Sequence, residues 1–265
     1  MFVRSGRVAL ALCLAVPAAL GAQGFQYAPS TGQYRVTSKT KGAQEAMGQK
    51  QEFEQSANEL LTVTVARQAK DTLAMTIVID SINLVGPMGM TPPGLDKVPG
   101  TKIAAKLAPH GGVYSATGPK DDSIPMGGQM TDEASRFLPR IRVPLVAGAS
   151  WTDTTTGKVN QRGVDLDRRS IATYKVVGDT TISGEKAWKI ARTSVTNLTG
   201  SGTAQGQPIT MEGTSNGTAT VFVSQKGVYV GSENEEQANV KIVFAANGME
   251  VAVATTANTS VQKVK

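Results

Sequence analysis

An alternation of apolar and polar side chains with a period of two residues recurs along most of the chain and constrains its fold more than any other feature. In residues 73–80, one side of an extended chain would carry Leu73, Met75, Ile77 and Ile79. The same pattern recurs in residues 34–36, 61–66, 103–107, 172–176, 221–223, 240–244 and 249–253. Such alternation is typical of strands that bury one face and expose the other. It predicts an all-β fold.

Short turn signals separate these strands. They lie at residues 68–71, 110–112, 178–179, 225–227 and 246–248. Connections this short join antiparallel neighbours, because a parallel pair needs a crossover of about a dozen residues or more. We therefore predict a long antiparallel meander that forms a curved sheet or half-barrel. Residues 43–51 carry both a helical and an extended pattern, and Gly48 favours the strand.

One short helix is predicted just before Pro139. Thr131 is a suitable N-cap, and the carboxylate of Asp132 suits the positive end of the helix dipole. Phe137 and Leu138 would lie on one side of this helix, which Pro139 would end.

Two segments rich in Gly, Pro and Met, residues 86–100 and 118–130, flank a hairpin predicted for residues 101–118. We expect them to cover one end or edge of the sheet. Methionine is flexible and polarisable, so it suits apolar surfaces that adapt to variable partners. The predicted ligand-binding residues are Met88, Met90, Met126, Met130 and Phe137. The alternative is that these residues only plug the open edge of the core.

The chain begins with the features of a secretory signal peptide. Arg4 and Arg7 precede a short apolar run, and small residues then offer cleavage after Gly21 or Ala22. Residues 1–22 are therefore predicted to be removed on export. The mature protein is expected in the periplasm or secreted, with association to the cell envelope left open.

Residues 23–265 are predicted to form a single all-β domain, with a subdivision near residues 139–151 left open. They contain no cysteine, because Cys13 lies in the signal peptide, and no run of the ~20 apolar residues that a spanning helix needs. Removal of residues 1–22 takes two of the 27 basic residues and leaves all 21 acidic ones, for a net charge of +4. The remaining basic residues are scattered, so a nucleic-acid partner is not expected.

The motifs that suggest catalysis lack the context that catalysis requires. His110 is the only histidine and lies at the predicted tip of the 101–118 hairpin, where a turn role is expected. Residues 213–217 match G-x-S-x-G, but a strand follows instead of the helix of a nucleophile elbow, so a β-turn is predicted. Asp165 and Asp167 lack the companion ligands of a calcium loop. We predict no enzyme activity, no metal and no cofactor.

Four short stretches are similar to a group of exported bacterial proteins of unknown function. They are residues 34–36, Met-Gly-Gln-Lys-Gln at 47–51, the segment 100–113 and the segment 144–151. This resemblance implies export and a β-rich fold, without catalytic residues. The architecture also resembles lipoprotein carriers of the LolA type, in which a curved antiparallel sheet holds an acyl chain beneath a small helical lid.

The sequence thus favours a binding protein whose curved sheet presents an apolar concave face. The predicted partner is a lipid, an acyl chain or a lipidated protein of the cell envelope. The alternative is a structural or protein-interaction module that pairs through exposed strand edges. An enzyme that uses acidic and lysine side chains is a third possibility, for which no pair stands out.

Overall fold

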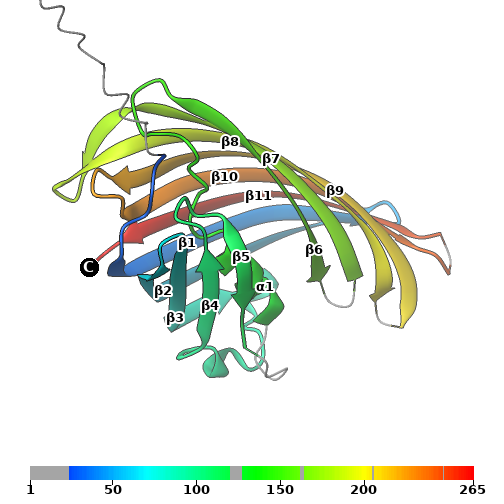
Figure 1. Cartoon of the computed structure of the whole chain (residues 1–265). Helices are drawn as coiled ribbons and strands as arrows, with labels where there is room; N and C mark the ends of the chain where they lie inside the picture. The colour runs from blue at the N-terminus through cyan, green and yellow to red at the C-terminus, as the bar shows by residue number, and fades with distance from the viewer. Residues whose placement is uncertain (1–23, 120–126, 162–163, 205, 247) are drawn as a thin grey trace, which may run out of the picture.

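The computed structural model describes residues 24–119, 127–161, 164–204, 206–246 and 248–265 (Figure 1). The strands are β1 (Ser30–Ala46), β2 (Gln49–Ala69), β3 (Thr72–Val85), β4 (Lys102–Leu107), β5 (Val113–Thr117), β6 (Ser150–Gln161), β7 (Val164–Ile182), β8 (Glu185–Ala204), β9 (Gln207–Ser224), β10 (Tyr229–Phe244) and β11 (Glu250–Lys263). The described part also contains the helix α1 (Gly127–Ser135) and two 3-10 turns, η1 (Pro87–Gly89) and η2 (Leu95–Lys97). The predicted all-β class with one short helix is confirmed. The predicted signal peptide lies outside the described residues.

All eleven strands form one antiparallel sheet in the order β5-β4-β3-β2-β1-β11-β10-β9-β8-β7-β6. Except for β5 and β6, neighbours in the chain are neighbours in the sheet, as the short turns predicted, and β11 pairs with β1 in the middle. The sheet is open, with β5 and β6 as its edges. The strands are long, and they arch together over α1 and the β4–β5 hairpin (Figure 1). The predicted curved antiparallel meander is therefore confirmed.

The strand register divides the side chains between two faces. Side chains of one phase point to the inner face and include the main core, and side chains of the alternate phase point to the outer face. At one end of the sheet, which we call the closed end, the inner-face side chains are buried in a single core. These are Tyr34, Leu61, Val63, Val65, Leu73, Met75, Ile77, Ile79, Ile103, Leu107, Trp151, Tyr174, Val176, Ile190, Val221, Val223 and Tyr229. The remaining lengths of β1, β2 and β6 to β11 form what we call the open half.

The segment 139–149 crosses the gap between the two edges of the sheet at the closed end. Ile141 is fully buried, and its backbone N–H donates to the carbonyl of His110 in the β4–β5 turn at 2.9 Å. Near the other edge, the indole Nε1 of Trp151 in β6 donates to the carbonyl of Arg140 at 2.8 Å. This segment therefore ties β5 to β6 by backbone and side-chain hydrogen bonds. The subdivision suggested near these residues stays a prediction.

Three local predictions are wrong. The turn predicted at residues 178–179 is a register shift between Val176 and Gly178, and β7 continues through it because a bulge absorbs the extra residue. The G-x-S-x-G stretch at 213–217 lies in the middle of β9 and is not a turn. The helix runs from Gly127 to Ser135, so Thr131 lies inside it and cannot cap it, and Phe137 and Leu138 lie beyond its end. The poor helix propensity of glycine hid this first turn.

Two other local predictions are confirmed. Residues 43–51 are extended, as favoured, and they contain the β1–β2 turn at Met47 and Gly48, both with positive φ (53° and 74°). His110 lies in the β4–β5 turn, where its ring Nδ1 accepts a hydrogen bond from the backbone N–H of Gly112 at 3.3 Å.

Candidate binding surface

Three of the predicted ligand-binding residues have described side chains, and these three do not gather at one place. Met130 is buried in the main core, whereas Met90 is 61% exposed. The ring of Phe137 packs edge-on against Tyr34 and Tyr229, with centroid separations of 5.4 and 5.2 Å. The side chain of Met88 and the whole of Met126 lie outside the described residues. Met130 and Phe137 therefore pack at the closed end, and a ligand-binding role for these residues stays a prediction.

The aromatic side chains at the closed end pack against one another. The hydroxyl of Tyr34 donates to the carbonyl of Tyr229 at 2.7 Å, and the two rings stack at 5.8 Å. Burial raises the pKa of Tyr229 to about 12, and it also raises the pKa of Tyr34 and Tyr174. Trp151 stacks on Tyr174 at 4.8 Å. This part of the inner face is filled by the protein itself.

The open half presents a second apolar region on the inner face, which we call the apolar floor. It consists of Leu198, Met211, Val240, Ile242, Val251 and Val253. The register places Met211, Ile242 and Val251 side by side on β9, β10 and β11. All members except Val251 are partly exposed. The floor continues into a small buried cluster formed by Val164, Leu166 and Ile209.

A polar belt separates the apolar floor from the closed end. Its inner-face members are Ser38, Thr40, Ser194, Thr196, Ser215, Asn234, Glu236, Thr255 and Thr259. The prediction of an apolar concave face is therefore right for the two ends of the inner face and wrong for its middle. The sequence concealed the difference because serine and threonine occupy both phases of these strands.

Glycines on the inner face allow the open half to curl. A Cβ atom at Gly200 in β8 would run into the carbonyl oxygen of Asp165 in β7, and one at Gly42 in β1 would lie 2.5 Å from the ring of Phe53. Neither site has room for a side chain. Glycine in a strand commonly marks such a close approach of backbones. Gly213 and Gly217 of the G-x-S-x-G stretch are also buried on this face, where their nearest neighbours are the side chains of Val240 and Ser194.

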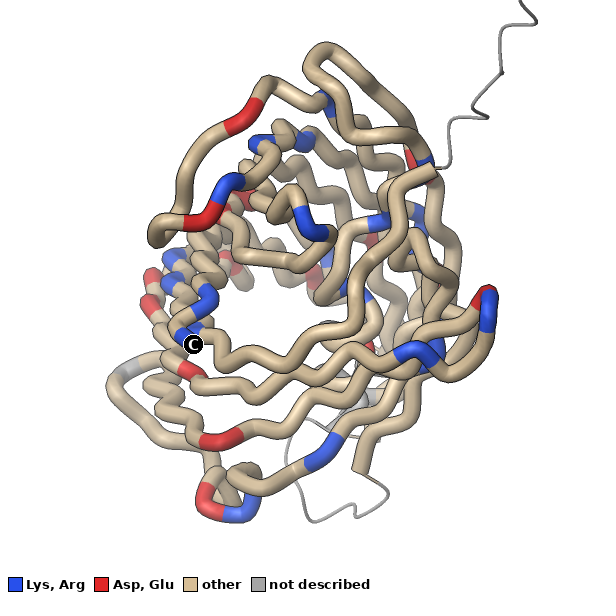
Figure 2. The backbone as a smooth tube through the Cα atoms, turned by 60° about the vertical axis from the view of Figure 1, so that its left-hand side comes forward, with Lys and Arg blue, Asp and Glu red and all other residues tan. Residues whose placement is uncertain are grey.

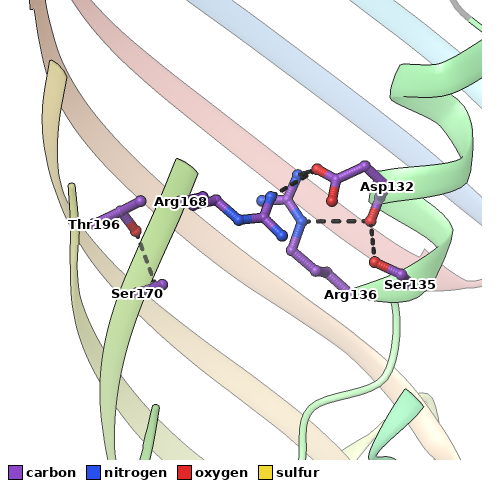
Figure 3. A network of polar contacts seen from close by, with 6 residues as sticks. All are labelled: Asp132, Ser135, Arg136, Arg168, Ser170 and Thr196. Carbon is purple, nitrogen blue, oxygen red and sulfur yellow. Dashed lines mark hydrogen bonds and ion pairs between the residues drawn. The ribbon is translucent and has the colours of Figure 1, made fainter. Parts of the chain in front are cut away.

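Helix α1 is tied across the inner face by an ion pair. The guanidinium of Arg168 projects from β7, and its Nη1 lies 2.7 Å from Oδ2 of Asp132 on α1 (Figure 3). Arg136 binds the same carboxylate oxygen at 2.5 Å. The side chains of Arg168 and Asp132 are only 16% and 20% exposed, so this pair is better shielded from water than a surface pair.

A second arginine, Arg192 in β8, also points to the inner face. Its Cζ atom lies 6.0 Å from the centroid of the Tyr174 ring. Its Nε is buried and has no hydrogen-bond partner in the described part of the protein. Sequence reasoning overlooked Arg192, although Ile190, Arg192 and Ser194 share one phase of a strand and a charge in a buried phase is unusual.

The outer face carries troughs whose walls mix polar and apolar groups. Two of them, of about 730 and 740 Å³, cross several strands between neighbouring rows of side chains. Their walls include Lys39, Asn58 and Glu235 in one trough and Lys41 and Glu54 in the other. Basic and acidic residues are interspersed along the backbone (Figure 2).

No three His, Cys, Asp or Glu side chains of the described residues come together in a way that could hold a metal ion. Among the same residues, no helix has the length and apolar character required to cross a membrane.

No family model and no curated protein matches the chain. Three solved structures give weak resemblances. A DUF1329 family protein from Desulfovibrio piger ATCC 29098 has 10% identity and a TM-score of 0.22, over 87% of this chain and 85% of the other. A domain described as an outer membrane lipoprotein-sorting protein, from Vibrio parahaemolyticus, has 8% identity and a TM-score of 0.20, over 88% and 84%. Neisserial surface protein A has 9% identity and a TM-score of 0.19, over 89% and 99%. Resemblances of this size do not identify a function.

Proposed function

We propose that the chain is an exported protein that binds a lipid, an acyl chain or a lipidated partner of the cell envelope along the inner face of its sheet. The observation that carries this proposal is the apolar floor. Val240, Ile242 and Val253 lie on the curled side of the sheet and are only partly covered by the protein. Apolar side chains that gather on a partly exposed concave surface are a common mark of a binding site.

The packing at the two ends supports the open half as the binding region. The closed end is filled by its own aromatic and aliphatic side chains. The apolar floor lies beyond the polar belt, and α1 reaches across the inner face through the pair of Asp132 and Arg168. A ligand chain would find apolar contacts on the floor without displacing any part of the closed-end core.

Native mass spectrometry of freshly purified mature protein tests the proposal, together with uptake of a fluorescent fatty acid. The wild-type protein should carry or take up an acyl compound. Replacing Val240 by Asn adds a polar group to the floor and should weaken uptake about tenfold, since burying an unpaired amide costs about 1–3 kcal/mol. The matched control is Val195→Asn, because Val195 is 49% exposed on the outer face.

A protein that is uniformly free of lipid in the mass spectrum and takes up no fatty acid would contradict the proposal. Equal losses in the Val240 and Val195 variants would show that uptake does not depend on the floor. Circular dichroism of both variants separates a loss of binding from a loss of fold.

A second candidate is a protein-interaction module that pairs through the edge strand β6. Thr156, Gly157 and Lys158 are all exposed, and no heavy atom outside the neighbouring residues lies within 4 Å of a Cβ built at Gly157. Free edges of this kind accept a strand from another protein. Cross-linking in intact cells separates the candidates, because a single dominant protein partner attached through Lys158 favours the module.

We also infer that the protein acts by binding and not by catalysis. The one histidine, His110, is engaged by its own turn through Gly112. A catalytic histidine instead needs a partner that orients it and a reacting group within hydrogen-bond reach. Hydrolysis of acyl esters by the pure protein, lost on His110→Ala, would overturn this inference.

A further inference from the structure

We propose that the inner face selects amphiphiles with an acidic head group, and that Arg192 binds the oxyanion of that group. This inference rests on the proposed function and adds the class of ligand to it. The recognised chemistry is a carboxylate or phosphate joined to an acyl chain.

Arg192 stands where the closed end meets the polar belt. On β8 it follows the fully buried Ile190 and precedes the half-buried Ser194 on the same face. Its guanidinium lies beside the ring of Tyr174, which is itself stacked on Trp151.

The guanidinium of Arg192 has no acidic partner among the described residues. The buried carboxylate of Asp153 is shared by Arg140 at 3.6 Å and Arg142 at 3.3 Å. Glu236 faces the same side from β10, two strands away, and forms no ion pair with Arg192 in the described part of the chain.

A partly buried cation with an unpaired N–H is costly, and an anionic ligand would remove that cost. Arginine is well suited to the task, because its planar guanidinium presents parallel N–H donors to a carboxylate or phosphate. The unpaired Nε of Arg192 is one of those donors.

Arg192 and Leu198, the member of the apolar floor in β8, are six positions apart, about 20 Å along a strand. The inner-face residues of β8 between them, Ser194 and Thr196, are small and polar and belong to the polar belt. An acyl chain whose head group binds Arg192 therefore crosses the polar belt before it contacts the floor.

Binding of three probes of equal chain length tests the inference: a fatty acid, an alkyl phosphate and a neutral monoacylglycerol. The wild-type protein should bind at least one of the acids about tenfold or more tightly than the neutral probe. The ratio between the two acids shows which oxyanion is preferred. Arg192→Gln should abolish the preference, and Arg192→Lys should keep part of it because the charge remains.

The matched control is Arg169→Gln, because Arg169 is exposed on the outer face of β7. This variant should retain the wild-type preference. If the wild type binds the neutral probe as tightly as both acids, or if Arg192→Gln keeps the preference, the role of Arg192 is refuted while acyl binding stands. If the wild type binds none of the three probes, the proposed function itself fails and the inference fails with it. Should Arg192→Gln not fold, the result of Arg192→Lys against the wild type decides.

Discussion

The closed end and the open half of the sheet are built from the same strands and yet are stabilised differently. At the closed end, inner-face side chains such as Ile190 and Val223 are fully buried beneath the aromatic cluster and the segment 139–149. In the open half, Ile242 and Val240 point to the same face and are only partly covered. A strand of 16 to 20 residues, such as β8 or β10, thus passes from a packed core into a partly open surface.

The two regions therefore differ in role: one stabilises the fold, and the other keeps apolar side chains accessible. Burial at the closed end supplies the free energy of folding, because buried apolar area is the main stabilising contribution. The open half relies on backbone pairing and on close contacts at inner-face glycines, so its apolar side chains remain available to a ligand. Four measurements test this difference between the closed end and the open half.

Truncation of one isoleucine at each end should show the largest contrast. Ile190→Ala removes a fully buried side chain and should lower the free energy of unfolding by about 2–5 kcal/mol. Ile242→Ala removes a partly exposed one and should cost about 1 kcal/mol. Urea denaturation measures both, and equal losses would refute the division between the two ends.

Alkaline pH should weaken the closed end selectively. The pKa of Tyr229 is raised to about 12 by burial, above its ordinary value of 10.0. The unfolded chain therefore ionises first, and the stabilisation present below about pH 10 is lost as the pH rises towards 12, with a loss of about 2–3 kcal/mol from this residue. Urea denaturation across this pH range measures the loss. Tyr229→Phe should reduce the dependence, with the remainder supplied by buried tyrosines such as Tyr34 and Tyr174, whereas Tyr114→Phe on the exposed side chain of β5 should leave it unchanged.

Two glycine substitutions test the curvature of the open half. Gly200→Ala places a methyl group against the backbone of Asp165 and should destabilise the protein by about 2 kcal/mol through overpacking. Gly157→Ala adds a methyl group in open space and should stabilise it by about 0.5 kcal/mol, since alanine restricts the unfolded chain. Thermal melting of both variants gives the signs. A harmless Gly200→Ala would mean that the sheet does not need its tight curl.

The smallest effect is expected from loss of the ion pair that joins α1 to β7. Asp132→Asn weakens the contact of α1 with Arg168 and should cost about 1 kcal/mol, with faster amide hydrogen exchange in α1. Asp167→Asn, on the exposed outer face of β7, should change stability by less than about 0.5 kcal/mol. If exchange in α1 is unaffected by Asp132→Asn, the helix is held by packing alone.

The sequence was informative about the fold wherever strands bury one face. The alternation of Leu73, Met75, Ile77 and Ile79 correctly predicted β3, and the short turns correctly predicted antiparallel neighbours. The full length of β2, 21 residues, was not predictable because residues 49–59 carry polar side chains in both phases. In the polar belt no packed layer demands apolar residues on one face, so the periodic signal disappears there and returns at the apolar floor in residues 240–244 and 249–253.

The candidate site was less predictable than the fold. Met130 and Phe137 were chosen for their apolar character. The sequence could not reveal that both side chains pack in or against the closed-end core. The members of the apolar floor come from β8 to β11, and only the strand register unites them. Arg192 did leave a local signal, a charge in the inward phase of a strand, whereas the absence of an acidic partner depends on tertiary structure.

The pairing of β1 with β11 sets an order on assembly. Tyr34 stands opposite Lys263, so the central seam of the sheet joins residues from the two ends of the chain. The hairpins from β1 to β5 and from β6 to β11 are local and can form early, whereas a contact as distant in sequence as that of β1 with β11 forms slowly. Until these two strands meet, β1 and β11 each expose an unpaired edge, and edges of this kind invite association with other chains. A newly made chain therefore has two free edges to keep from its neighbours until β1 and β11 pair.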